Sequence, residues 1–297
     1  TVTTVFNGAA EKLVIDGSDV TLVNGTNVLT TNNGTVVTVS VISGIASVTL
    51  TSSSGLDAAT AQTILDTMAY RNDSESPTVS NRVVTLSSVS DNGGSANGGV
   101  PTASIGIFST VAVVGVNDAP VLAGGPYSLP SINEDTPSTG VRVSTLLTNY
   151  TLVDADTGAL RGIAVYGKSG NGTWQYSTDN ANWTDFGAVS GSSALLLAST
   201  TYLRYVPNSA NGETASLNFR GWDQTSGTAS INGVRGVSDT TSNGGTTAFS
   251  TATAVVNQIV TSLNDAPVLT GASPTLPGLS DGAVNNPGVL VSSLYST

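Results

Sequence analysis

The pentapeptide Asn-Asp-Ala-Pro-Val occurs twice, at residues 117–121 and 264–268, so that Pro120 and Pro267 lie 147 residues apart. The residues after the two copies also match. The first copy continues as Leu-Ala-Gly … Leu-Pro … Gly-Val … Val-Ser … Leu, and the second as Leu-Thr-Gly … Leu-Pro … Gly-Val … Val-Ser … Leu. A repeat this long indicates whole domains joined by a common connector. We therefore expect domains at residues 1–116 and 117–263, and the start of a third at residues 264–297.

The connectors are expected to be short and stiff. Proline fixes its own φ angle and holds the preceding residue in an extended conformation. The chain begins and ends inside the repeats, which predicts a window from a longer array whose first domain is shortened at its N-terminus.

Short runs of alternating β-branched residues recur between Gly, Asn and Ser clusters, and this pattern is typical of strands in antiparallel β-sandwiches. The clearest runs are residues 36–41, 46–51, 82–86, 201–206 and 216–220. One segment differs, since residues 57–68 combine helix-forming residues with Asp57 in a capping position. The sequence therefore predicts an all-β fold of tandem sandwiches, with one short helix in the first domain.

The composition excludes several classes of function. Charged residues make up 10% of the chain, and 20 acidic against 9 basic residues give a net charge of −11. We expect no nucleic-acid partner, because no basic patch could release counterions from a phosphate backbone. The chain has no Cys or His, which removes thiolate zinc sites and the commonest general base. No apolar run is long enough for a membrane span in this segment.

Two carboxylates are spaced to bind a cation. Asp154 and Asp156 stand two residues apart in a predicted loop that ends at Gly158. Calcium takes six to eight oxygen ligands in flexible geometry, several of them carboxylates, and these two side chains can face one ion. Isolated acids in predicted turns are instead expected to accept hydrogen bonds from backbone N–H groups: Asp16, Asp19, Asp179, Asp185 and Asp239.

The second domain resembles a cadherin repeat over most of residues 117–268. The resemblance is carried by Pro-Val-Leu at 120–122, Tyr127, Ile-Asn-Glu-Asp-Thr-Pro at 132–137, Asp-Ala-Asp-Thr-Gly at 154–158, a strand ending in Tyr166, and Asp223 followed by Gly227. The Asn-Asp-Ala-Pro-Val connector and the segment Gly-Thr-Trp-Gln-Tyr-Ser at 172–177 are more similar to the cadherin-like repeats of giant bacterial adhesins. The first domain shares mainly its last half.

This resemblance implies a cadherin- or immunoglobulin-like fold with Ca²⁺ at the connectors between domains. It implies ligands at the first connector from Asn117, Asp118, Asp154, Asp156 and Asp223, with Asp73 and Glu75 contributed by the first domain. At the second connector it implies Glu134, Asn264 and Asp265. Gly115 and Ser262 stand where cadherins carry another ligating Asp, so fewer ions per junction are expected than in cadherins.

The function that follows is structural. We expect a secreted, cell-surface segment of a bacterial adhesin stalk or filament, whose neighbouring repeats are held rigid by Ca²⁺, with no enzymatic activity. A glycan- or cell-binding module is the alternative, and it requires exposed aromatic residues; we expect the side chains of Trp174, Trp183 and Trp222 to lie mainly in the core. Assembly into a homopolymer by strand addition between subunits is a further alternative.

Overall fold

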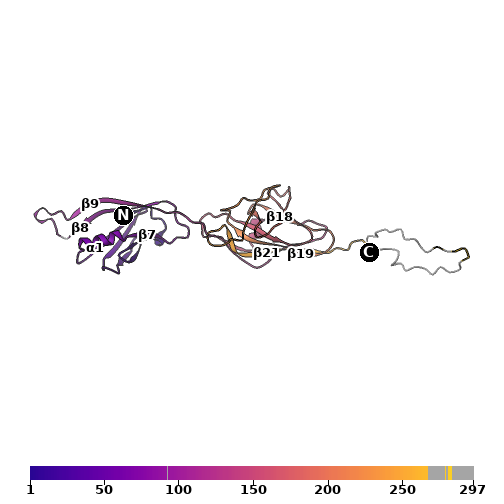
Figure 1. Ribbon diagram of the computed structural model, residues 1–297, viewed down its shortest axis with the longest axis horizontal. Coiled ribbons are helices and arrows are strands. Elements are labelled where there is room, and N and C mark those ends of the chain that lie inside the picture. The colour runs from indigo at the N-terminus through magenta and orange to yellow at the C-terminus, as the bar shows by residue number, and fades with distance from the viewer. Residues whose placement is uncertain (92, 267–277, 279, 283–297) are drawn as a thin grey trace.

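The computed structural model describes residues 1–91, 93–266, 278 and 280–282. Strands make up 45% of the chain. The all-β prediction is confirmed at this level. Figure 1 shows two β-rich bodies placed end to end. Each sheet takes all its strands either from residues 2–112, here called the first module, or from residues 121–261, the second module. The predicted start of a third repeat lies mostly outside the described residues.

The first module pairs a six-stranded sheet with a three-stranded one. The larger sheet has the order β4 (Asn27–Leu29), β5 (Val36–Ile42), β6 (Ile45–Thr51), β1 (Val2–Thr3), β8 (Asn81–Ser90) and β9 (Thr102–Ala112). The smaller sheet has the order β3 (Ser18–Thr21), β2 (Glu11–Ile15) and β7 (Ala69–Asn72). Every pairing is antiparallel. Two short 3₁₀ turns are η1 (Gly8–Ala10) and η2 (Ala96–Gly98).

The predicted helix of the first module is present as α1 (Ala58–Asp66). Its first turn is capped by Asp57, whose Oδ1 accepts a hydrogen bond from the Thr60 N–H at 2.7 Å. Ile64 is buried on its inner side and joins the core between the two sheets, which contains Leu13, Ile15 and Val37 among others.

The second module contains a six-stranded, a four-stranded and a two-stranded sheet. The six-stranded order is β11 (Tyr127–Asn133), β21 (Phe249–Thr261), β19 (Glu213–Trp222), β14 (Gly162–Lys168), β17 (Ala194–Ala198) and β20 (Val237–Ser238). The four-stranded order is β12 (Val141–Arg142), β18 (Tyr202–Val206), β15 (Thr173–Ser177) and β16 (Thr184–Asp185). The third sheet pairs β10 (Val121–Ala123) with β13 (Thr151–Val153).

Two features of the second module depart from the sequence-based expectation of antiparallel strands and a single helix. β11 runs parallel to β21, with Tyr127 beside Val256 and Leu129 beside Gln258. A second helix, α2 (Val143–Leu147), buries Val143 and Leu146. Its N-cap residue makes no side-chain hydrogen bond to the helix, so the usual sequence signal for a helix start is missing.

The tryptophans are mainly core residues, as predicted. Trp174 and Trp222 are each 1% exposed. Trp174 packs against Tyr205 in a tilted arrangement, with ring centroids 4.9 Å apart. Trp183 is half-buried at the surface, where the Arg204 guanidinium lies 4.1 Å from its ring centroid.

Candidate functional site

The first connector lies against the end of the second module. Asn117 Nδ2 donates to Asp223 Oδ2 at 3.0 Å and to the Thr247 carbonyl at 3.2 Å. The Ala119 N–H donates to the Gly245 carbonyl at 2.8 Å, and Pro120 is buried. These contacts fix the connector to the loops at this end.

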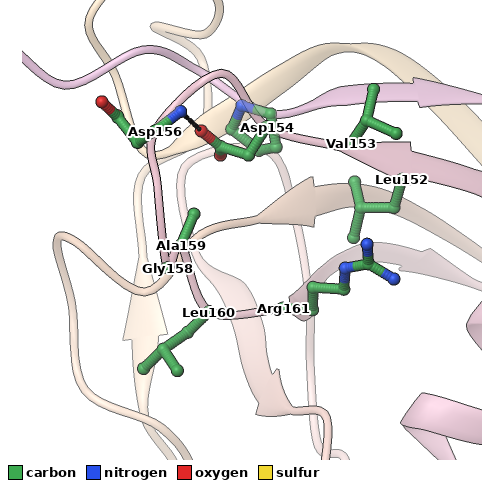
Figure 2. A pocket seen from close by; sticks show the side chains of 9 residues that line it. Leu152, Val153, Asp154, Asp156, Gly158, Ala159, Leu160 and Arg161 are labelled. Carbon is green, nitrogen blue, oxygen red and sulfur yellow. Dashed lines mark hydrogen bonds between the residues drawn. The ribbon is translucent and has the colours of Figure 1, made fainter. Parts of the chain in front are cut away.

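Antiparallel pairing of β10 with β13 brings Asp154 and Asp156 next to the first connector, at the same end of the second module. Val121 pairs with Val153, so the residues before β10 and after β13 are neighbours. The Asp118 N–H donates to Asp156 Oδ2 at 2.8 Å, and the Asp156 N–H donates to Asp154 Oδ1 at 2.9 Å. Figure 2 shows the second of these bonds within the loop. Gly158, with a φ of +82°, lets the loop turn back toward β14.

Asp223 reaches the same place from β19, directly after the buried Trp222. It is 2% exposed, and its Oδ1 accepts hydrogen bonds from the Thr225 N–H at 2.8 Å and the Thr225 hydroxyl at 2.6 Å. The structure therefore brings together all five residues predicted for the second module's side of the first connector. We call this group the linker cluster: Asn117, Asp118, Asp154, Asp156 and Asp223.

The linker cluster carries negative charge without a protein cation to balance it. Burial raises the pKa of Asp154, and the negative charges of Asp223, Asp156 and Asp118 raise it further. Asp154 Oδ2 is buried and has no hydrogen-bond partner. No ion pair involving a member of the cluster is found among the described residues. A hollow of about 190 Å³ opens beside Asp154 and Asp156, and Arg161 lies on its wall.

The carboxylates of the cluster are neighbours but do not converge as finished ligands. Within the described ranges, no three acidic side chains stand together in the arrangement of a metal centre. Two of the relevant oxygens accept hydrogen bonds instead, Asp156 Oδ2 from the Asp118 N–H and Asp223 Oδ2 from Asn117. These two carboxylates are therefore already held by protein donors.

The opposite end of the second module holds a buried glutamate. Glu134 is 1% exposed, and its Oε1 accepts a hydrogen bond from the Leu263 N–H at 2.6 Å. Its Oε2 is buried and has no hydrogen-bond partner. Asn264 Nδ2 donates to the Asp265 carbonyl at 3.4 Å, as Asn117 Nδ2 does to the Asp118 carbonyl at 3.3 Å. Asn264 and Asp265 thus repeat this one contact of the first connector.

The first module contributes differently from the prediction. Asp73 forms ion pairs with Lys12 at 2.8 Å and with Arg71 at 2.7 Å, and these cations lower its pKa, Arg71 most strongly. Its carboxylate is therefore already neutralised. Glu75 is exposed. The structure does not bring Asp73 into the linker cluster.

One contact at this junction was not anticipated from the sequence. Ser76 Oγ donates to the Thr157 hydroxyl at 3.0 Å and accepts a hydrogen bond from the Thr157 N–H at 3.0 Å. It joins the two modules beside Asp156 and places the segment containing Glu75 near the linker cluster. Thr157 adjoins the aspartate pair in the sequence, whereas nothing around Ser76 signals this role.

The predicted turn role of the remaining aspartates is confirmed for three of them. Asp179 accepts hydrogen bonds from the Ala181 and Asn182 N–H groups, and Asp16 and Asp239 each accept one from the backbone. The prediction is wrong for Asp19, which pairs with Arg71 at 2.8 Å. Asp185 lies in β16 and accepts from the Gln175 side chain.

Comparisons with family models, with curated proteins and with solved structures found no match to this chain. Within the part of the chain that the structure describes, no helix is long and apolar enough to cross a membrane.

Proposed function

We propose that this chain is a structural segment of a long extracellular repeat protein, an adhesin stalk or surface filament, in which Ca²⁺ at the connectors stiffens the array. The observation that carries the proposal is the buried Asp154 Oδ2, which has no partner and lies among three further carboxylates. A buried acidic oxygen without a hydrogen bond or a cation is costly. A bound divalent cation removes that cost.

Calcium fits the donor set better than other metals. The linker cluster offers only oxygen ligands from carboxylates, a side-chain amide and nearby backbone carbonyls, and the chain has no His or Cys for zinc or copper. We include Glu75 as the ligand from the first module, because the contact between Ser76 and Thr157 holds its segment at this junction. Asp73 is left out because two cations already occupy its carboxylate.

The second connector supplies a second site of the same kind. Glu134 presents a buried, unpartnered Oε2 next to the chain that leads to Asn264 and Asp265. We propose that these three residues bind Ca²⁺ together with ligands from the residues that follow.

Ion binding would stiffen the connector between the two modules. Without a cation, the like charges at Asp118, Asp154, Asp156 and Asp223 repel one another and the connector bends more freely. Extracellular modules bind Ca²⁺ with dissociation constants of about 10⁻⁴ to 10⁻³ M, so millimolar Ca²⁺ outside cells fills even weak sites. Location at the cell surface is part of this proposal.

The burial of two of the three tryptophans disfavours the glycan-binding alternative. Trp174 and Trp222 lie in the core and offer no platform to a sugar ring. Trp183 is only half-buried, but Arg204 covers its ring. The proposal also assigns no catalytic role, because the paired carboxylates lie at connectors between modules.

The test is small-angle scattering and limited proteolysis of the full chain with Ca²⁺ and with chelator. We expect a longer, narrower particle with Ca²⁺ and faster cleavage near Asn117 with chelator. The variant Asp154→Asn should bind Ca²⁺ at least about tenfold more weakly. Asp239→Asn is the matched control, since Asp239 is bonded within its own turn to Thr241. Identical scattering curves and cleavage rates under both conditions would refute the proposal.

A further inference from the structure

The side-chain contact between the two modules is made by a loop with little regular structure of its own. Residues 73–80, here called the docking loop, connect β7 to β8 and carry Ser76 to Thr157 at the junction. The side chain of Val79 in this loop is 67% exposed, so the loop gains little from the hydrophobic core. Its shape therefore depends mainly on polar contacts.

One buried arginine reaches three acceptors on the docking loop. Arg82 is 0% exposed. Its Nη1 donates to the Ser80 carbonyl at 2.8 Å and to the Ser80 hydroxyl at 2.5 Å, and its Nη2 donates to the Thr78 carbonyl at 3.2 Å. Its other hydrogen bonds go to Glu11 Oε1, from Nε and Nη2, and to Asn7 Oδ1. The guanidinium thus joins the docking loop to the buried part of the first module.

Asn7 extends this network toward Ser76. The Asn7 Oδ1 that accepts from Arg82 also accepts a hydrogen bond from the Thr78 N–H at 3.1 Å. Asn7 Nδ2 donates to the Thr78 hydroxyl at 3.4 Å. Between Thr78 and Ser76 stands Pro77, and proline holds the residue before it in an extended conformation. The backbone of Ser76 is therefore tied to a point that Arg82 and Asn7 hold.

The arginine and the docking loop constrain each other. A buried guanidinium needs acceptors for its N–H groups, because a buried donor without a partner is destabilising. If the loop moved away from β8, Arg82 would lose its acceptors on Ser80 and Thr78 while remaining buried. Residues 78–80 are thus held in place from inside the module, although the loop itself lies at the surface.

We propose that Arg82 is a positioning residue for the junction: it holds the docking loop in the shape in which Ser76 bonds to Thr157 of the second module. This link needs no ion. Thr157 directly follows Asp156 of the linker cluster, and Glu75 directly precedes Ser76. The consequence for Ca²⁺ rests on the proposed function: a displaced docking loop carries Glu75 away from the cluster and weakens ion binding.

The experiment separates positioning from stability. In Glu11→Leu/Arg82→Met the buried pair is replaced by apolar side chains, which is often close to neutral for stability, but the docking loop loses its donors. Amide hydrogen exchange at the Thr157 N–H, measured on the full chain in chelator, reports the contact because Ser76 Oγ accepts from that group. We expect an unfolding midpoint close to that of the wild type and exchange about two- to tenfold faster, the effect of losing one net hydrogen bond.

Two serine variants calibrate the measurement. Ser76→Ala removes the contact itself and should speed the exchange at Thr157 by the same factor. Ser74→Ala is the matched control in the same loop, because the hydrogen bond of Ser74 to the Asn72 side chain uses its backbone N–H. This variant should exchange like the wild type.

Two further variants separate the loop from the fold. Ile64→Val shortens a buried core side chain of the first module, so it should lower the unfolding midpoint without changing the exchange at Thr157. Arg82→Lys keeps a positive charge beside Glu11 but loses the planar fork that reaches several acceptors at once. It should speed the exchange, and it serves as the test if circular dichroism shows the double variant to be unfolded.

Two results would overturn the inference. One is exchange at Thr157 that stays as slow as in the wild type when Arg82 is replaced, although Ser76→Ala speeds it. The other is equal exchange in Ser76→Ala and the wild type. Since the exchange is measured in chelator, a chain that binds no Ca²⁺ would refute the calcium sites and leave this inference standing. Normal Ca²⁺ binding with unchanged exchange in the Arg82 variants would refute the positioning role alone.

Discussion

The two modules balance their acidic side chains in different ways. All ion pairs found among the described residues join residues of the first module, where Glu11 pairs with Arg82 and Asp19 and Asp73 share Lys12 and Arg71. The four carboxylates of the linker cluster lie in or beside the second module and have no such partner. The first module thus pairs three of its acids with its own cations, whereas the linker cluster is the site that we propose an external cation fills.

The Glu11–Arg82 pair shows how far internal neutralisation goes. Both side chains are 0% exposed, and Arg82 Nη2 donates to Glu11 Oε1 at 2.6 Å. The same oxygen also accepts hydrogen bonds from the Phe6 and Asn7 N–H groups. This pair ties the start of β2 to the start of β8, so it stabilises the contact between the two sheets of the first module.

The largest effect is expected from breaking this pair. Glu11→Leu leaves the Arg82 guanidinium buried without a counter-charge and should lower the free energy of unfolding by about 3–5 kcal/mol. Urea unfolding measures the change. The double variant Glu11→Leu/Arg82→Met should recover most of the loss, because replacing both members of a buried pair is often close to neutral. A single variant as stable as the wild type would contradict the comparison.

The next effect concerns Asp154, whose substitution by Asn is not expected to lower the stability of the protein when Ca²⁺ is absent. Folding raises the pKa of this carboxyl group above its unfolded value of 3.8. Such a group lowers the stability of the protein as the pH rises from the unfolded pKa through the folded pKa. Asp154→Asn should therefore be at least as stable as the wild type at neutral pH in chelator. With Ca²⁺ present, the wild type should gain thermal stability and the variant should gain much less. Thermal unfolding with and without Ca²⁺ tests both statements.

The sequence predicts those parts of the site that depend on local pairing. Asp154 and Asp156 meet the connector because β10 and β13 pair over three residues next to it, and the spacing of the motif carries that information. Asp73 could not be assigned in this way. Its cations arrive through the pairing of Lys12 with Arg71 between β2 and β7, which are far apart in the sequence.

The same distinction applies to the fold. Alternating residues and the capping Asp57 predict strands and α1, because these signals lie within the elements themselves. Helix α2 spans five residues, has no side-chain cap, and forms because Val143 and Leu146 are buried in the core. The parallel position of β11 beside β21 depends on residues about 130 apart, and no local pattern encodes it.

A smaller effect is expected at a turn of the second module that needs no ion. Hydrogen bonds from the Asn182 side chain and from backbone N–H groups hold the pKa of Asp179 well below its usual range. An acid with a lowered folded pKa stabilises the protein above its unfolded value, 3.8, and that stability is lost as the pH falls below it. Asp179→Asn should therefore lower stability at neutral pH and weaken its dependence on acid. Equal acid unfolding curves for variant and wild type would contradict this.

The smallest effect is expected at Asp73. This aspartate has two cationic partners, whereas Asp154 in the linker cluster has none among the described residues. Its ion pairs lie at the surface, with 41% of the side chain exposed, and such pairs contribute little because water and salt screen them. Asp73→Asn should leave both the unfolding midpoint and the Ca²⁺ affinity nearly unchanged, and Asp154→Asn measured beside it should change the affinity. A large loss of Ca²⁺ binding in Asp73→Asn would show that the cation displaces Lys12 and Arg71, and would place this carboxylate in the site after all.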